Sequence, residues 1–198
     1  MFDRIVIASS NAGKLREIRQ LLTPLNIEAL PQSDFDVPEA DEPYFTFIEN
    51  ALAKARHASL HSGLPALADD SGICVDALHG APGVYSARFG GEPKSDARNN
   101  EKLLEALACK LDRRAHYYCV MVLARNPEDP QPLIAQGVWQ GEILETPRGN
   151  GGFGYDPLFL DLKTGLTGAE LPAEIKNRIS HRGHAMREML QLIERLQP

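Results

Sequence analysis

Strand-like and helix-like hydrophobic patterns alternate along the chain. A short apolar run at Arg4–Ala8 predicts a buried strand, and the segment after it carries Leu and Ile at helical spacing. The sequence between them, Ser9–Lys14, is therefore predicted to be a strand-to-helix loop. Thr46 and Glu49 have the spacing of a capping box, which predicts a helix from there to Gly63.

The middle of the chain contains an acidic pair between two apolar segments. Ala66–Ala68 and Ile73–Val75 are predicted to be short strands on either side of Asp69–Gly72. Because Asp, Ser and Gly favour turns, we expect the acidic pair at a strand end or in a hairpin turn.

The second half predicts a hairpin, a glycine-rich loop and a last helix. His116–Ala124 and Leu133–Glu145 have the composition of two long strands, while Arg148–Pro157 is rich in glycine. Asp96 is expected to cap a helix, and Ala185–Leu196 has one apolar face.

Helices and strands thus intermix without an internal repeat or an obvious linker, which predicts an α/β fold with a mixed sheet flanked by helices. Pro31–Pro43 is expected to be an irregular acidic stretch. With 198 residues, the chain is expected to form a single domain over 1–198, with two lobes.

Composition excludes several classes of protein. A net charge of −6 argues against a non-specific nucleic-acid binder, which needs a surface rich in Lys and Arg. The cysteines Cys74, Cys109 and Cys119 form no Cys-x-x-Cys pair and indicate a reducing compartment. Met1–Ser10 lacks the pattern of a signal peptide, and no apolar run is long enough for a membrane helix. We therefore expect a cytoplasmic protein that contacts neither nucleic acid nor membrane.

The loop Ser9–Lys14 is a candidate anion site. Exposed N–H groups at the start of a helix attract anions, and Lys14 adds a full charge. The loop is not a Walker A motif, because Ala8 and Leu15 stand where that motif needs Gly and a hydroxyl. An ordinary turn with Ser10 or Asn11 as the helix cap explains the same residues.

Acidic residues provide candidate metal ligands. Asp69 and Asp70 offer hard oxygen ligands of the kind that Mg²⁺ prefers, although a plain turn also accounts for them. A second acidic pair, Asp41 and Glu42, lies in a predicted loop before a helix, where a solvated loop is the alternative.

Aromatic and basic residues near the C-terminus provide candidate base-binding groups. Phe153 or Tyr155 in the glycine loop can stack on a base, although glycine turns alone explain the loop. Lys176 and Ser180–Gly183 supply cations, or simply a basic turn between helices. An Arg such as Arg182 only donates hydrogen bonds, so it favours a 6-oxopurine over adenine.

Taken together, these segments resemble the family of inosine/xanthosine triphosphate pyrophosphatases, which remove deaminated purine nucleotides. The resemblance spans nearly the whole chain and is carried by Ser9–Lys14, Thr46–Ala51 with Lys54, Ala68–Gly72, Gly80–Arg88, Gly151–Pro157 and Ile179–Gly183.

The resemblance implies a fold, an assembly and a set of site residues. The fold would be an elongated mixed sheet in two lobes around a central nucleotide cleft, in a homodimer with Mg²⁺ as cofactor. Asp70 would be the general base and a metal ligand, with Asp41 favoured over Glu42 as the second metal carboxylate. The substrate-binding residues would be Ser9, Ser10, Asn11, Ala12, Gly13, Lys14, Ser71, Phe153, Gly154, Tyr155, Asp156, Lys176, His181 and Arg182.

The implied reaction is hydrolysis of ITP, dITP and XTP at the α-phosphorus, which releases pyrophosphate. An ionised Asp70 as base predicts activity that rises from neutral to alkaline pH. Two alternatives remain open: a nucleotide-binding sensor without turnover, and a pyrophosphatase of modified pyrimidine nucleotides. A two-carboxylate glycosidase is disfavoured, because it would leave the Lys14 loop without a purpose.

Overall fold

The chain forms two compact units. Unit 1 consists of Met1–Asp70, Cys119–Gly137 and His184–Pro198, and unit 2 consists of Ser71–Tyr118 and Val138–Gly183. The computed structural model describes residues 2–9, 14–15, 18–19, 22 and 27–196. A single domain over residues 1–198, divided into lobes around a cleft, remains a prediction.

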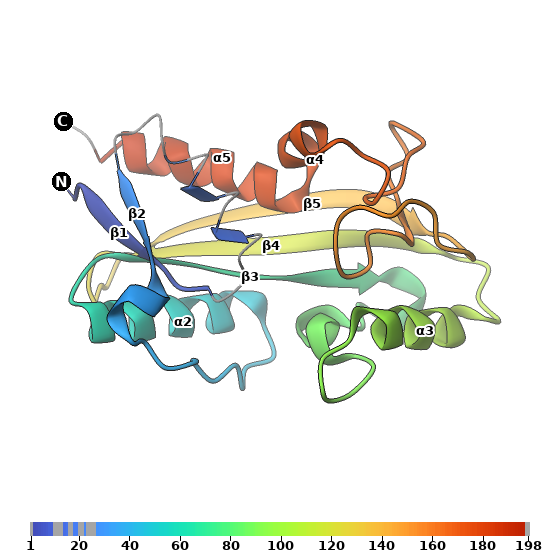
Figure 1. Cartoon of the computed structure of the whole chain (residues 1–198), viewed down its shortest axis with the longest axis horizontal. Helices are drawn as coiled ribbons and strands as arrows, with labels where there is room; N and C mark the ends of the chain where they lie inside the picture. The colour runs from blue at the N-terminus through green and yellow to red at the C-terminus, as the bar shows by residue number, and fades with distance from the viewer. Residues whose placement is uncertain (1, 10–13, 16–17, 20–21, 23–26, 197–198) are drawn as a thin grey trace. The chain divides into compact units, whose positions relative to one another are not determined.

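The strands form a mixed sheet, which confirms the predicted α/β class (Figure 1). Strand β1 is parallel to both β2 and β3, whereas β5 is antiparallel to β6. The order of hydrogen-bonded strands is β2-β1-β3-β4-β5-β6. Their bounds are β1 Arg4–Ile7, β2 Glu28–Pro31, β3 Ala66–Val75, β4 Arg114–Ala124, β5 Leu133–Ile143 and β6 Phe159–Leu160.

Helices follow the predicted pattern with adjusted ends. Residues 14–15, 18–19 and 22 are helical, which agrees with the helix expected after the Lys14 loop as far as the structure describes it. The named helices are α2 Phe47–Ser62, α3 Asp96–Leu107, α4 Ala173–Ile179 and α5 His181–Glu194, with 3-10 turns η2 Gln32–Phe35, η3 Asp76–Leu78 and η4 Gly83–Arg88.

Helix α2 has the predicted ends. Thr46 is extended and its Oγ accepts the N–H of Glu49 at 3.3 Å. Gly63 ends the helix in the left-handed region, at a φ of 68°, where a residue without Cβ is favoured. The inner face of α2 carries the fully buried Ala51 and Ala55, whose small side chains let the helix lie close to the sheet.

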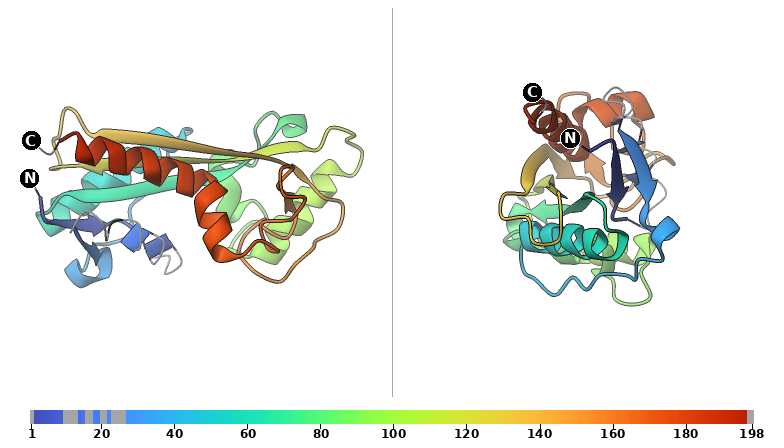
Figure 2. Two further views of the ribbon diagram at one scale, coloured as in Figure 1. Left: turned by 90° about the horizontal axis from the view of Figure 1, so that it is seen from above. Right: turned by 90° about the vertical axis from the view of Figure 1, so that its left-hand side faces the viewer.

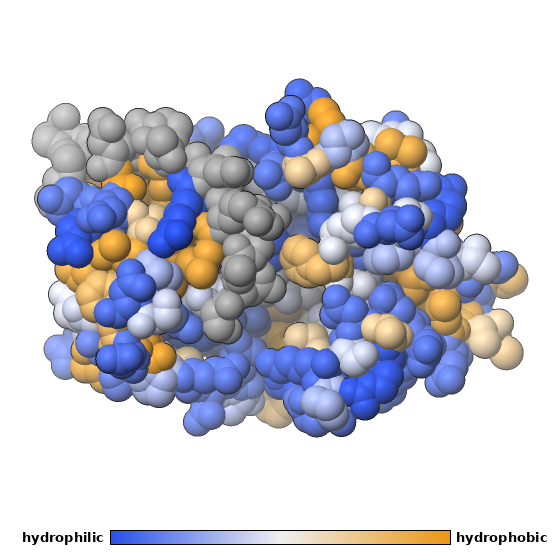
Figure 3. Space-filling model, in the orientation of Figure 1, coloured by the Kyte–Doolittle hydropathy of each residue, from blue (hydrophilic) through white to orange (hydrophobic). Residues whose placement is uncertain are grey.

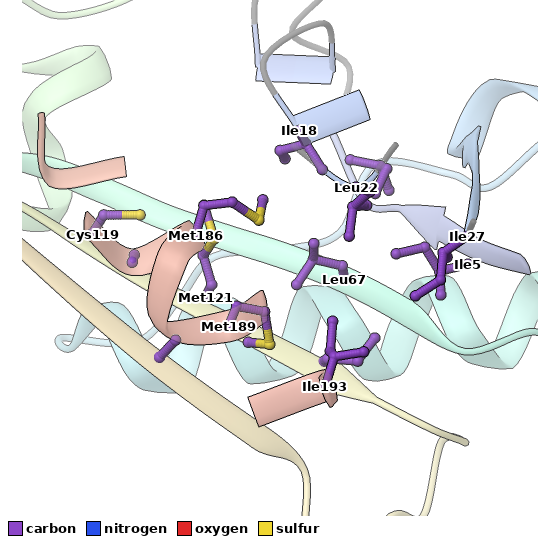
Figure 4. Close-up of a cluster of buried hydrophobic side chains, with 14 residues drawn as sticks. Ile5, Ile18, Leu22, Ile27, Leu67, Cys119, Met121, Met186, Met189 and Ile193 are labelled. Atoms are coloured by element: carbon purple, nitrogen blue, oxygen red, sulfur yellow. The ribbon is translucent and has the colours of Figure 1, made fainter. Parts of the chain in front are cut away.

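Helices α2 and α5 lie on opposite sides of the strands of unit 1 (Figures 1 and 2). The side of α5 is filled by a hydrophobic cluster in which Met186, Met189 and Ile193 of α5 meet Met121 of β4 and Leu67 of β3 (Figure 4). Unbranched methionine side chains fill irregular space between a helix and a twisted sheet.

Unit 2 has a separate core centred on aromatic side chains. The ring centroids of Tyr117 and Trp139 each lie 4.7 Å from that of Phe159, in tilted arrangements that aromatic rings prefer. The buried indole N–H of Trp139 donates to Asp161 Oδ1 at 2.9 Å, so this polar group is paired inside the core.

Some expected boundaries were wrong. Pro31–Pro43 is not irregular throughout, because its first residue closes β2 and Gln32–Phe35 form η2. The cap of α3 is Ser95, whose Oγ accepts the N–H of Arg98, and Asp96 is the first helical residue. Asp96 has another partner, described below.

No described helix is long and apolar enough to cross a membrane. The face of the molecule in Figure 3 is mostly hydrophilic, with separate small hydrophobic areas. Cys74, Cys109 and Cys119 are free thiols in the structure.

The hairpin β4–β5 is closed by residues 125–132, a connection too short for parallel strands. Buried Asp129 organises this turn. Its carboxylate accepts hydrogen bonds from the N–H of Arg125 at 3.0 Å, from the Arg125 guanidinium and from the N–H of Gln131 at 2.9 Å. These donors, the guanidinium first, hold the pKa of Asp129 well below its usual range.

We expect Asp129→Ala to lower the free energy of unfolding by about 1–2 kcal/mol at pH 7, because two backbone N–H groups of the turn and the Arg125 guanidinium lose their acceptor. A lowered pKa means that this stabilisation is present above the unfolded pKa, near 4, and is lost as pH falls towards the folded value. Urea unfolding at pH 7 and pH 3 measures both effects, with exposed Glu128→Ala as the control. An equal difference at the two pH values would contradict the account.

Candidate functional site

Asp69 and Asp70 lie in the middle of strand β3 and are both buried, with 3% and 7% of their surfaces exposed. Successive side chains of a strand point to opposite faces of the sheet. Each carboxylate accordingly has its own lysine: Lys14 Nζ lies 2.8 Å from Asp69 Oδ2, and Lys54 Nζ lies 3.0 Å from Asp70 Oδ1.

The expectation of a turn at Asp69–Gly72 was wrong. Ala66–Val75 is one continuous strand of 10 residues. The turn propensities of Asp, Ser and Gly are overridden by tertiary context, because β3 has β1 and β4 as hydrogen-bonded neighbours and the buried carboxylates are paired. The sheet therefore carries the acidic residues in its interior.

Lys54 joins two acidic segments that are far apart in the sequence. Its Nζ lies 2.9 Å from Glu42 Oε1 as well as 3.0 Å from Asp70 Oδ1. Asn50 holds the Glu42 segment in place, since its side chain accepts from Tyr44 N and donates to Tyr44 O, both at 3.1 Å. Its amide also approaches Asp70 Oδ2, at 3.5 Å.

Of the two candidate metal carboxylates before α2, Glu42 shares Lys54 with Asp70. Asp41 is exposed. The assignment of Asp41 to a metal is not tested by this arrangement and stays a prediction.

Sequence reasoning did not place Lys54 and Asn50 among the site residues. The two residues are four positions apart and lie on the face of α2 that carries the buried alanines. A Lys and an Asn on an otherwise small, apolar helix face are the signal that would have identified them, because such groups are buried only with partners.

The charges in this cluster shift one another's pKa. Burial raises the pKa of Asp70 above its usual value, with Lys54 acting in the opposite direction. Burial lowers the pKa of Lys54, but the neighbouring carboxylates, Asp70 first, outweigh it and the pKa is raised. Lys54 is therefore the group that opposes the effect of burial on the Asp70 carboxylate.

Most of the predicted phosphate loop lies outside the described residues, namely Ser10, Asn11, Ala12 and Gly13. Ser9 is described: it follows β1, and its N–H donates to Ile7 O at 2.9 Å. The other end of the loop, Lys14, is paired with Asp69 as given above.

In unit 2 the glycine loop is organised by Asp156. Its buried carboxylate accepts the N–H of Phe153 at 2.8 Å and pairs with Lys176 Nζ. Glycines line this carboxylate: a Cβ at Gly168 would lie 2.7 Å from Asp156 Oδ1, so a larger residue there would displace it. Asp156 thus contacts two residues that were predicted to bind the substrate, Phe153 and Lys176.

Phe153 presents its ring to two cations. The ring is 43% exposed, with Lys176 Nζ 5.0 Å and Arg182 Cζ 6.0 Å from its centroid. Cations at such distances are attracted to an aromatic face. In contrast, Tyr155 points into the core of unit 2, where its hydroxyl donates to Ser86 O at 2.8 Å.

His181 and Arg182 form the first turn of α5 and do not precede the last helix, which starts at His181 and not at Ala185 as expected. This early start depends on Gly183, where a Cβ would collide with Asn177 O. The ring of His181 stacks on Tyr117, with centroids 4.6 Å apart, and Arg182 Nη2 donates to Ser71 Oγ at 3.3 Å. Both basic side chains are buried.

Comparison with known proteins identifies the family of the chain. The model of the Ham1 family matches residues 5–192. The chain belongs to the Ham1 family. It is 63% identical over 191 residues to a dITP/XTP pyrophosphatase of Nitrosomonas europaea, covering 96% of this chain and 94% of that protein. It is 64% identical over 190 residues to a dITP/XTP pyrophosphatase of Aromatoleum aromaticum, covering 96% of each.

Solved structures of Ham1 proteins share the fold. A HAM1 protein from Coxiella burnetii superimposes with a TM-score of 0.93 at 49% identity, covering 98% of this chain and 100% of that one. The Staphylococcus aureus Ham1 protein gives a TM-score of 0.89 at 38% identity, with the same coverage. The Ham1 fold thus extends over nearly the whole chain.

We expect Lys54→Met to lower the free energy of unfolding by about 3 kcal/mol at pH 8, because Asp70 and Glu42 lose their shared cation. The raised pKa of Asp70 sets the pH dependence: its ionised form is the costly one, so the loss shrinks as pH falls and Asp70 binds a proton. Thermal unfolding at pH 8 and pH 5 measures this change, with exposed Lys110→Met as the matched control. A loss that grows towards pH 5 would refute the role of Lys54.

Proposed function

We propose that this chain hydrolyses non-standard purine nucleoside triphosphates, namely ITP, dITP and XTP, to the nucleoside monophosphate and pyrophosphate. The observation that carries the proposal is the identity of more than half of its residues with relatives named dITP/XTP pyrophosphatase, over nearly the full length of both chains. The chemistry of the two residue groups supports it: unit 1 offers cations and carboxylates suited to phosphate, and unit 2 offers an aromatic face with hydrogen-bond donors.

The triphosphate is proposed to bind at Ser9–Lys14. Ser9 follows β1 and Lys14 is helical, and backbone N–H groups at the start of a helix favour anions. Lys14 adds a cation that already sits beside Asp69, so its ammonium is held in place before any phosphate binds.

Glu42 and Asp70 are proposed to hold Mg²⁺. Their oxygens share one cation, Lys54, and they are the hard ligands that Mg²⁺ accepts. Mg²⁺ usually takes one or two protein carboxylates and completes its shell with phosphate and water. When bound, the ion would neutralise charge on the leaving pyrophosphate.

Asp70 is proposed to be the general base. It would take a proton from the water that attacks the α-phosphorus, while the bond between the α-phosphorus and the bridging oxygen breaks and pyrophosphate leaves. Lys54 Nζ lies 3.0 Å from one oxygen of this carboxylate and favours its charged form, and Asn50 Nδ2 lies 3.5 Å from the other oxygen. These contacts orient the base before the substrate arrives.

The base is proposed to be recognised by unit 2. Phe153 offers a stacking face, and Lys176, His181 and Arg182 donate hydrogen bonds, as a 6-oxo group requires. Ser71 accepts a hydrogen bond from Arg182 within unit 2 and is proposed to contact the substrate there. Gly154, Tyr155 and Asp156 belong to the same loop and are proposed, as the family resemblance implies, to line the nucleotide site with Phe153.

The chain is further proposed to act as a cytoplasmic homodimer. Free thiols at all three cysteines support the reducing compartment. The dimer is supported by the family resemblance described above.

Asp70→Asn is expected to reduce pyrophosphate release from ITP and XTP by at least about a hundredfold, because an amide neither accepts the proton of water nor ligates a cation as strongly. Release from ITP, XTP, GTP and ATP is measured with and without Mg²⁺, on the wild type and the variant. The exposed Asp34→Asn is the control. In the wild type, activity should rise from neutral to alkaline pH.

No release from any of these nucleotides, with tight binding intact, would replace the enzyme by a nucleotide sensor. Turnover of modified pyrimidine nucleotides in preference to ITP would assign the chain a different substrate class. Turnover without added or residual divalent metal would contradict the carboxylate pair at Glu42 and Asp70.

Arg182→Ala is expected to lower the ITP/ATP ratio of kcat/KM by roughly 10- to 100-fold, because a donor to the 6-oxo group is lost. Binding of the triphosphate group should change less. Steady-state kinetics on both nucleotides measure the ratio, with Arg187→Ala, an exposed position on the same helix, as the control. An equal loss on ITP and ATP would assign Arg182 a purely structural role.

A further inference from the structure

Helix α3 contacts the glycine-rich loop of unit 2, Arg148–Pro157, through hydrogen bonds to one residue, Gly154. Asp96 Oδ2 accepts the N–H of Gly154 at 2.7 Å, and Asn100 Nδ2 donates to the carbonyl of Gly154 at 2.9 Å. Asp96 and Asn100 are four residues apart, so they lie on the same face of the helix. Two side chains of one helix thus take both backbone polar groups of a single glycine.

We propose that Asp96 and Asn100 are positioning residues for base recognition: by fixing Gly154 they set the place of the Phe153 ring and thereby the affinity for the 6-oxopurine nucleotide. This inference rests on the proposed function of the Phe153 loop. Neither residue is among those predicted from the sequence to contact the substrate.

The loop needs these two hydrogen bonds to stay in one shape, because its glycines allow many backbone conformations. Gly149, Gly152 and Gly154 all have positive φ, and Gly154 lies at 62°. A glycine loses more conformational freedom on ordering than any other residue, so a loop of this composition stays in one shape only if its polar groups are tethered. The partly exposed Phe153 lies between two of these glycines.

The tether at Asn100 has one possible orientation. Its Nδ2 donates to the carbonyl of Asp96 at 2.9 Å as well as to that of Gly154. Reversing the amide would place its oxygen against two carbonyl oxygens, which repel it. The nitrogen is therefore the atom that faces Gly154, and a residue of the same shape without a donor cannot replace it.

The loop is held from two sides with Phe153 in the middle. Asp156 binds the N–H of Phe153 on one side, and α3 binds Gly154 on the other. The ring then keeps its place against Lys176 and Arg182. Because the N–H and C=O of Gly154 are already used, they support the ring and do not read the base.

A contact that orders a loop before binding improves affinity and leaves the chemical step unchanged. Asn100→Asp, which keeps the shape and removes the donor, should raise the KM for ITP roughly tenfold, as should Asp96→Ala. The kcat should stay within about twofold for both variants. The Kd for IMP, measured by calorimetry, should rise by the same factor as the KM.

Asp96→Asn tests the hydrogen bond separately from the charge. Its amide oxygen can still accept the N–H of Gly154, so its KM should lie between those of the wild type and Asp96→Ala. Glu101→Ala, at an exposed position of α3, is the control for general effects on this helix. Asp96 is also exposed, so Asp96→Ala remains informative if Asn100→Asp lowers stability.

The outcomes separate the inference from the proposed function. The inference would be overturned if Asn100→Asp and Asp96→Ala both had the KM and Kd of the wild type. A loss of kcat at constant KM would also overturn it. A wild type that binds IMP but does not release pyrophosphate from ITP would overturn the proposed function, while weaker IMP binding in the variants would still support the positioning role. A wild type that neither binds IMP nor hydrolyses ITP would overturn both.

Discussion

The pairing of two buried carboxylates with two lysines in strand β3 is the constraint on which the rest of the structure depends. Asp69 and Asp70 occupy interior positions where an unpaired charge would cost several kcal/mol. Because neighbouring strand residues face opposite sides, one cation has to arrive on each side. Lys14 and Lys54 meet this requirement from two separate helical segments. The positions of those segments follow from the chemistry of β3.

The same strand connects the two groups of polar residues. β3 passes from unit 1 to unit 2 at the peptide between Asp70 and Ser71. Asp70 is bonded to Lys54 in unit 1, and Ser71 is bonded to Arg182 in unit 2. Consecutive residues of one strand thus begin two separate sets of polar contacts, one in each unit.

The sequence predicted those parts of the fold that depend on local pattern. Thr46, Glu49 and Gly63 mark the ends of α2 because caps act within one helical turn. It failed at Asp69–Gly72, where four residues with turn propensity form strand because long-range pairing prevails. Local patterns do not report such pairing.

Candidate residues could be named from the sequence where motifs are contiguous, as around Phe153 and at His181 and Arg182, and their roles stay predictions. Lys54 was quoted only as part of a motif, because its partners Glu42 and Asp70 come from two other segments. The choice between Asp41 and Glu42 likewise depends on which side chain the folded loop turns towards α2, and spacing alone does not determine that.

The buried alanines of α2 also affect the position of Lys54. Ala51 and Ala55 are fully buried, and Ala55 follows Lys54 in the sequence. A protein interior is too densely packed to absorb an added methylene without movement. A larger residue on this face would lift the helix and move the ammonium away from Asp70 although it touches no substrate. The packing of two small side chains thus also sets the distance between the ammonium of Lys54 and the carboxylate of Asp70.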